Sequence, residues 1–318
     1  MTVSPDGSLA DISATGRAPR RLRRIEILVN SRAGHAGPNA AGELERIAAE
    51  FGLDYRVRAP PPEELVRELK QAVDAAPDLL VLLAGDGTAR AAASLCGADG
   101  PLLAPLAGGT MNMLPHALYG LGDWKSALVQ TLKTGIETPV SGGEVDGQRF
   151  YVAAILGEPA IWAQAREAAR MHQLQLAWRV SRQAWRRRFS HRIRFSLDRG
   201  PEVKTLALTL MCPLVSKAMA GDERALEAAK LDPHGITEAL RLGARTALSR
   251  LVGDWRNDPS VEITLCREGV VWSGGSHLRA VLDGEPTRLH QRSELRFLPV
   301  AFRALAPPHD PPVATAKS

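Results

Sequence analysis

The sequence predicts an α/β fold in two parts: an N-terminal doubly wound parallel-sheet domain and a C-terminal, mainly antiparallel β-sandwich-like domain. Over residues 23–138, strand-like apolar runs alternate with segments of helical periodicity. After Pro139, short strand-like runs follow one another without regular helical crossovers. We therefore expect domains at 23–138 and 139–306, with a disordered lead-in at 1–22 and a disordered, proline-rich tail at 307–318.

Each strand of the first domain is expected to lead into a helix. The run Leu79–Ala84 is continuously apolar, which suits a strand covered on both faces. Prolines precede the helix that carries Leu65, Leu69 and Val73 at helical spacing. The predicted strands are 23–30, 53–59, 77–84 and 101–107, and the predicted helices are 39–52, 61–76, 88–95, 111–120 and 123–135.

The second domain is expected to be built from short strands, interrupted by helical stretches at 160–188 and 236–251. The predicted strands are 147–156, 191–198, 202–212, 260–266, 269–274, 277–285 and 293–300.

Three glycine-containing loops end strands of the parallel sheet: "NSRAG" from Asn30, "AGDGT" from Ala84 and "AGGTMN" from Ala107. Ligands of such sheets bind at the carboxyl ends of the strands. A glycine turn before a helix offers free N–H groups and the positive end of the helix dipole, which favours phosphate. Asp86 would then act through a cation, or accept a proton or hydrogen bond, and Thr88 could donate to a phosphate oxygen. Alternatively, Asp86 or Thr88 is an ordinary helix cap.

The net charge, the apolar run lengths and the cysteine spacing limit which ligands and which cellular location we expect. The net charge is +5 and the pI is about 9.4, which suits phosphorylated ligands, anionic lipid or nucleic acid. No apolar run is long enough to span a bilayer, and the polar, then basic N-terminus lacks the apolar stretch of a secretory signal. The three cysteines show no metal-ligand spacing. These features predict a cytoplasmic protein, or one that is peripheral at the inner face of the membrane.

These motifs together resemble the diacylglycerol kinase catalytic-domain family, which includes bacterial lipid kinases, sphingosine kinases and ceramide kinases. "NSRAG" is similar to the family's Asn-Pro-x-Ser-Gly, "AGDGT" to its Gly-Gly-Asp-Gly-Thr, and "PLAGGTMNM" to its Pro-x-Gly-Thr-x-Asn-Asp. The family's Leu-Asp-Gly-Glu stands intact from Leu282 to Glu285. The resemblance spans about residues 23–308.

The resemblance implies a nucleotide-binding α/β domain, a β-sandwich-like domain and an active site in the cleft between them. Glu285 would be the general base for a lipid hydroxyl, and Asp86 would also serve catalysis. ATP and Mg²⁺ would be the cosubstrate and the cofactor. Asp222 would be a metal ligand, with Asp232 as the competing choice. The residues that would bind ATP are Asn30, Gly85, Asp86, Gly87, Thr88, Gly109, Thr110 and Asn112.

The sequence also departs from the family pattern. Met113 replaces the last aspartate of the third motif, Ala91 stands where a glutamate is usual, and Ser141 replaces an aspartate. The sequence therefore has fewer acidic residues between the domains than the family pattern, so that either the acceptor differs or catalysis is weak or lost. Three functions stay open: a kinase of diacylglycerol or a related lipid, including a sphingoid base; another small-molecule kinase; or a nucleotide- or lipid-binding relative without turnover.

The segment from Trp178 to Phe195 combines aromatic residues at near-helical spacing with many arginines. Such a segment suits transient contact with an anionic membrane surface, where a lipid substrate would lie. A packed helix with a solvated arginine face is the alternative, and nucleic-acid binding is not expected.

Overall fold

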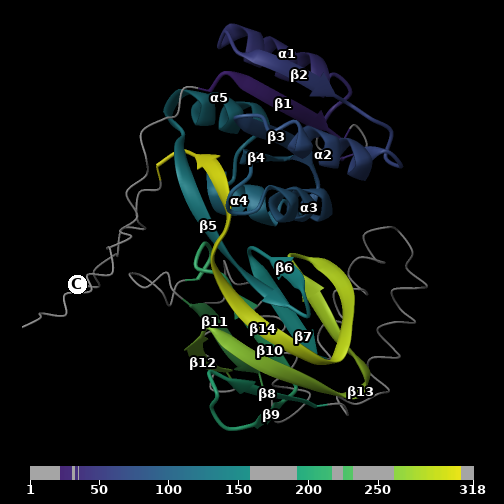
Figure 1. Ribbon diagram of the computed structural model, residues 1–318, viewed down its shortest axis with the longest axis vertical. Helices are drawn as coiled ribbons and strands as arrows, with labels where there is room; N and C mark the ends of the chain where they lie inside the picture. Colours follow the sequence, from purple (N-terminus) through teal and green to yellow (C-terminus); the bar gives the residue numbers. More distant parts are fainter. Residues whose placement is uncertain are drawn as a thin grey trace, which may run out of the picture.

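The computed structural model describes residues 22–30, 33–34, 36–157, 192–216, 225–231 and 261–308 (Figure 1). The helices predicted at 160–188 and 236–251 lie outside the described residues. So does nearly all of both predicted disordered ends.

The first part of the chain forms a parallel sheet in the order β4-β3-β1-β2. β1 lies between β2 and β3, so the chain reverses its direction of travel across the sheet after β2. Such a reversal creates a crevice at the carboxyl ends of the two strands that flank it, here β1 and β3. The strands are β1 (Arg24–Val29), β2 (Asp54–Arg58), β3 (Leu79–Ala84) and β4 (Leu102–Ala107).

Helices cover both faces of this sheet (Figure 1). One core cluster joins α1 and α5 to the strands, and another joins α2, α3 and α4 to the opposite face. The prediction of a doubly wound α/β fold is therefore confirmed. The helices are α1 (Ala40–Glu50), α2 (Leu65–Asp74), α3 (Asp86–Cys96), α4 (Met113–Tyr119) and α5 (Trp124–Thr134).

The second part is antiparallel, as predicted, and its strands pack around a further core cluster. The runs at 269–274 and 277–285 were expected as two strands, which is wrong. They form one long strand, because an irregularity between Trp272 and His277 shifts the register without ending the pairing. The strands are β5 (Ile136–Val145), β6 (Gln148–Phe150), β7 (Ala153–Gly157), β8 (Ile193–Leu197), β9 (Val203–Thr205), β10 (Ala207–Met211), β11 (Leu226–Leu231), β12 (Val261–Cys266), β13 (Glu268–Leu282) and β14 (Glu285–Ala306).

Two strands connect the parallel and antiparallel parts (Figure 1). β5 pairs with the second half of β14, and Ala304 of β14 also pairs in parallel with Leu103 of β4. The predicted boundary at 138 falls inside β5. All the described strands thus belong to one hydrogen-bonded sheet of 14 strands, which continues from one part into the other.

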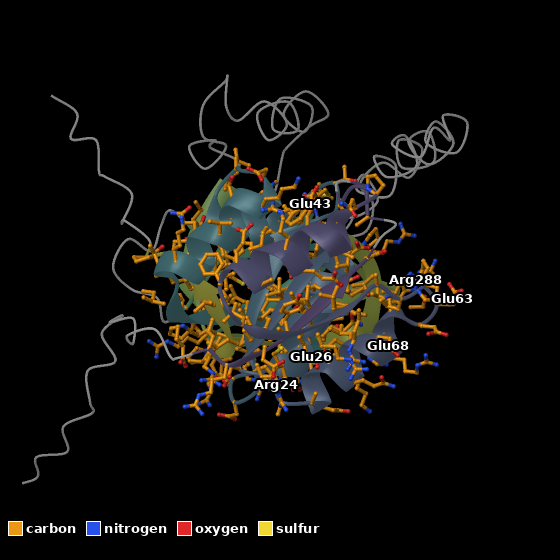
Figure 2. The ribbon with its side chains drawn as sticks, turned by 90° about the horizontal axis from the view of Figure 1, so that it is seen from above. Arg24, Glu26, Glu43, Glu63, Glu68 and Arg288 are labelled. Carbon is orange, nitrogen blue, oxygen red and sulfur yellow. The ribbon has the colours of Figure 1, made fainter. Side chains whose placement is uncertain are left out.

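A partly buried ion-pair network fixes the outer edge of the parallel sheet. Arg58 of β2 pairs through Nε with Glu26 of β1 at 2.9 Å and through a terminal nitrogen with Glu68 of α2 at 2.8 Å. Glu26 and Glu68 lie on the same flank of the molecule in Figure 2. One fork-shaped guanidinium can serve two carboxylates, so the network ties the edge strand and its crossover helix to the centre of the sheet.

The loops after β3 and β4 pack backbone against backbone. A methyl group added at Gly109 would lie 2.6 Å from the Cα atom of Gly85, and one added at Gly108 would lie 2.9 Å from the backbone nitrogen of Ala84. Side chains cannot occupy these positions without displacing the neighbouring loop.

We expect Gly109→Ala to lower the free energy of unfolding by about 1–3 kcal/mol, because the added methyl group overpacks this contact. Urea denaturation measures the change. Gly122→Ala is the matched control, since a methyl group there meets nothing within 4 Å. Equal stability of the two variants would contradict the close contact.

Candidate active site

The glycine loop after β3 leads directly into α3. Gly85 is the extended N-cap residue of this helix, with φ −85° and ψ 175°, and Ala89 N–H donates to its carbonyl. The first amides of an α-helix have no carbonyl partner within the helix. The chain therefore presents backbone donors and a positive dipole end at Asp86–Thr88, which is the arrangement that binds phosphate.

Asp86 links this loop to the loop after β4. Its carboxylate oxygens accept the backbone N–H groups of Asn112, at 2.8 Å, and Met113, at 2.6 Å. Burial raises the pKa of Asp86, against the lowering effect of these hydrogen bonds. Asp86 thus holds the start of α4 from a different loop, whereas α3 has Gly85 as its N-cap residue and no side-chain cap hydrogen bond, so Asp86 and Thr88 are not ordinary caps of α3.

Asn112 shapes the same loop. It is buried and adopts a left-handed conformation, with φ 51° and ψ 44°. Its Oδ1 accepts Gly109 N–H at 2.7 Å, and its Nδ2 donates to the Gly109 carbonyl at 2.8 Å. The side chain therefore holds Gly109 in place, while Thr110 at the tip of the loop is exposed.

Asn30 lies at the end of β1, on the other side of the crevice. Its backbone N–H donates to the carbonyl of Leu83 at 2.9 Å, which places it beside β3, the strand that precedes Gly85. The predicted nucleotide-binding residues after β1, β3 and β4 are thus at one edge of the sheet.

Glu285 comes from the antiparallel part and meets the glycine loop. A methyl group added at Gly87 would lie 3.5 Å from Oε1 of Glu285. The intervening Asp283 and Gly284 have φ values of 47° and 87°, and Leu282 pairs with Glu285. Two residues with positive φ form a tight type I′ hairpin turn, which presents Glu285 at the start of β14.

Asp283 anchors this turn, a role that sequence reasoning missed. Its carboxylate is buried and accepts the backbone N–H groups of Tyr151, Val152 and Ala153 at 2.8–3.0 Å. Burial raises its pKa to about 6. The Asp-Gly pair indicates a hairpin turn in the sequence. No sequence pattern indicates the backbone groups that Asp283 binds, because they lie 130–132 residues away.

The methionine at position 113 lies against the hairpin turn. A methyl group added at Gly284 would be 3.3 Å from the sulfur of Met113 and 3.4 Å from that of Met111. Apolar thioether surface thus faces the turn where the family pattern places a carboxylate.

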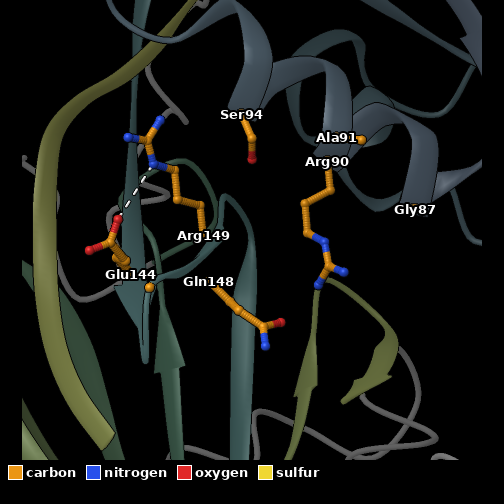
Figure 3. A pocket seen from close by; sticks show the side chains of 8 residues that line it. Gly87, Arg90, Ala91, Ser94, Glu144, Gln148 and Arg149 are labelled. Atoms are coloured by element: carbon orange, nitrogen blue, oxygen red, sulfur yellow. Dashed lines mark ion pairs between the residues drawn. The ribbon is translucent and has the colours of Figure 1, made fainter. Parts of the chain in front are cut away.

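A pocket of about 480 Å³ opens beside Gly87, between α3 and the β5–β6 hairpin (Figure 3). Arg90, Ala91 and Ser94 line it from the helix, and Glu144, Gln148 and Arg149 line it from the hairpin.

The predicted metal ligand Asp222 lies outside the described residues, as does Asp232. Within the described ranges, no group of three His, Cys, Asp or Glu side chains could hold a metal ion. Mg²⁺ commonly takes only one or two protein carboxylates and completes its shell with phosphates and water. The glycine loop fits that mode through the phosphates its amides would hold, with Glu285 as the nearby carboxylate, because both oxygens of Asp86 already accept backbone N–H groups.

Residues 24–145 match the family model of the diacylglycerol kinase catalytic domain. A crystal structure of a diacylglycerol kinase from Bacillus anthracis strain Sterne superimposes with a TM-score of 0.65 at 14% identity, covering 91% of this chain and 99% of the other. Two further solved structures from that organism give TM-scores of 0.68 and 0.65 at 17% and 16% identity, covering 91% of this chain and 99% and 98% of theirs. No curated protein matches the chain.

The segment 24–145 thus matches the diacylglycerol kinase catalytic domain family, which confirms the resemblance drawn from the motifs. At the level of that family, the match implies a kinase that uses ATP. No described helix is long and apolar enough to cross a membrane.

The titration of Asp283 gives a prediction for stability. Because its folded pKa of about 6 exceeds the value of 3.8 for a free aspartate, the folded state binds more protons between these two pH values. We expect the unfolding free energy of the wild type, relative to Asp283→Asn, to fall by up to about 3 kcal/mol as pH rises from 4 to 6, and to level off above. Urea denaturation at several pH values measures this difference. A relative stability that rises with pH would contradict the assignment.

Proposed function

We propose that this protein is an ATP-dependent lipid kinase that transfers the γ-phosphoryl group of ATP to a lipid hydroxyl, with diacylglycerol or a related lipid as acceptor. The position of Glu285 carries the proposal. Its carboxylate lies next to Gly87. Gly87 is in the first turn of α3, the helix whose amides would bind phosphate. A base and a phosphate-binding loop in contact are the two parts that phosphoryl transfer to an alcohol needs.

In the proposed reaction, the lipid hydroxyl lies between Glu285 and the γ-phosphorus. Glu285 accepts the hydroxyl proton, the lipid oxygen forms a bond to the γ-phosphorus, and the bond from that phosphorus to the β–γ bridging oxygen breaks. ADP leaves with the electron pair of the broken bond. Amides of the first turn of α3 would stabilise the charge on the transferred group.

The remaining predicted residues would shape the nucleotide site. Asp86 and Asn112 hold the loops after β3 and β4 through backbone groups, so they would position donors for ATP. Thr88 and the exposed Thr110 would offer hydroxyl groups. Mg²⁺, when bound with ATP, would neutralise phosphate charge.

A binding protein without turnover is the second candidate. The observation that favours it is the thioether of Met113 against the Gly284 turn, where the family pattern has a carboxylate. Glu285 and Asp86 are both present in this chain. The two candidates therefore differ in whether Glu285 accepts a proton from a hydroxyl that attacks the phosphate.

We expect Glu285→Gln to lower kcat by about 10²–10⁴-fold while the Kd for ATP stays unchanged, because the amide cannot accept the proton. The assay incubates protein with Mg-ATP carrying a labelled γ-phosphate and a lipid extract, and follows labelled phospholipid. Glu294→Gln is the control, since it removes an exposed carboxylate from the same strand, where Glu294 pairs with Arg292. Full activity of Glu285→Gln would refute the base. ATP binding without labelled lipid in the wild type would select the second candidate.

We also propose that the basic segment from Trp178 to Phe195 contacts anionic membrane. Its described end, Arg192–Phe195, leads into β8, where Ile193 and Phe195 are buried, and the rest lies outside the described residues. The composition of the segment and the need to reach a lipid support the proposal.

Replacing Arg186, Arg187 and Arg188 by glutamate should reduce flotation with anionic vesicles by at least tenfold at low salt, because three positive charges become negative. Vesicles of neutral phosphatidylcholine provide the baseline. Unchanged flotation with the anionic vesicles would reject the contact.

A further inference from the structure

The pocket beside Gly87 has two walls from distant parts of the chain. α3 supplies Arg90 and Ser94, and the β5–β6 hairpin supplies Gln148 and Arg149 (Figure 3). The walls are joined by the hydrogen bond between Ser94 Oγ and Tyr151 Oη at 2.8 Å. Its volume of about 480 Å³ suits a small polar group and the first part of an attached chain.

The charges that line this pocket are mostly positive. Arg90 and Arg149 rise from opposite walls, and the one carboxylate of the lining is Glu144. Glu144 is shared: it lies 3.5 Å from Nε of Arg149 and 2.9 Å from a terminal nitrogen of Arg296, which is not part of the lining. Among the residues that line the pocket, two guanidinium groups therefore face one shared carboxylate, so positive charge is in excess there; the carboxylate of Glu285 adjoins the pocket at Gly87.

Both arginines keep donors available. A terminal nitrogen of Arg90 donates to the carbonyl of Leu282 at 3.2 Å, and its positive charge lowers the pKa of the buried Asp283, with which it makes no ion pair in the described part of the chain. Arg149 pairs with Glu144 through Nε at 3.5 Å, longer than a good charge-assisted hydrogen bond, and also has a side-chain hydrogen bond with Tyr151. A guanidinium has five N–H donors, so each retains groups that could contact a ligand.

Ala91 lines the same pocket from α3, next to Arg90, and adds no negative charge to it (Figure 3). A carboxylate at this position would compensate the excess. Ala91 thus replaces the family's usual glutamate in a pocket that two arginines line. Both features favour the binding of an anion.

We propose that this pocket binds a phosphate group carried by the acceptor, so that the preferred acceptor is a lipid with a phosphate-bearing headgroup and a free hydroxyl. Two guanidinium forks on opposite walls match the geometry of phosphate oxygens. The pocket adjoins Gly87, and Gly87 adjoins Glu285, so a hydroxyl next to the bound phosphate could reach the base. The inference rests on the proposed kinase function, whose acceptor it specifies.

A matched pair of short-chain lipids tests the proposal without requiring turnover. 1-Octanoylglycerol and its 3-phosphate both carry a free hydroxyl and differ in the phosphate. We expect the wild type to bind the phosphate at least tenfold more tightly, as measured by calorimetry below the micelle concentration. Arg149→Gln and Arg90→Gln should each reduce this preference to threefold or less. Arg296→Gln is the control, because it removes the other partner of Glu144 and should leave the preference intact.

Several outcomes would overturn the proposal. Equal binding of the two lipids by the wild type would do so, as would an unchanged preference in Arg149→Gln. If glycerol 3-phosphate bound as tightly as its octanoyl ester, the phosphate would belong to a soluble ligand, and the lipid assignment would fall. An increase in the KM for ATP in Arg149→Gln, equal with both acceptors, would place the arginine on the nucleotide instead.

The same measurements separate this inference from the kinase proposal. Phosphoryl transfer to the neutral lipid without a binding preference would refute the phosphate pocket and leave the kinase intact. A binding preference that depends on both arginines, with no transfer to any lipid, would refute the kinase and leave the pocket intact.

Discussion

The buried carboxylate of Asp283 is the interaction on which the arrangement of the site depends. It accepts three successive backbone N–H groups at the start of β7, and so fixes the turn that joins the two longest strands. A buried acceptor with three donors has little freedom to move, because each lost hydrogen bond would leave a buried donor unsatisfied. Glu285, two residues further on, is therefore held against the glycine loop of the other part of the molecule.

On the opposite side of the site, Asp86 performs the equivalent task with two backbone N–H groups from another loop. Both aspartates thus build the site by holding the backbone. The side chains that are left to face a ligand come from Glu285, Thr88, Thr110 and the two pocket arginines. Because these contacts use backbone N–H groups, they do not require a carboxylate at position 91 or 113.

The sequence alone predicted the features that depend on local periodicity and turn chemistry. The alternation of apolar runs and helical segments identified the parallel sheet, and the glycines after β3 and β4 identified the edge of the sheet at which the candidate site lies. What could not be predicted depends on contacts between distant residues. The anchoring of Asp283 at Tyr151, the continuity of β13 through its irregular segment and the return of β14 to β4 leave no local pattern. The pocket could not be predicted for the same reason, because its two arginines come from distant elements, Arg90 from α3 and Arg149 from the β5–β6 hairpin.

The most direct test of the account is a structure of the protein with a non-hydrolysable ATP analogue. The account predicts that the terminal phosphate lies at the backbone amides of Asp86–Thr88, on the side that faces Glu285. A nucleotide whose phosphates lie away from the first turn of α3, or whose terminal phosphate is shielded from Glu285, would contradict it.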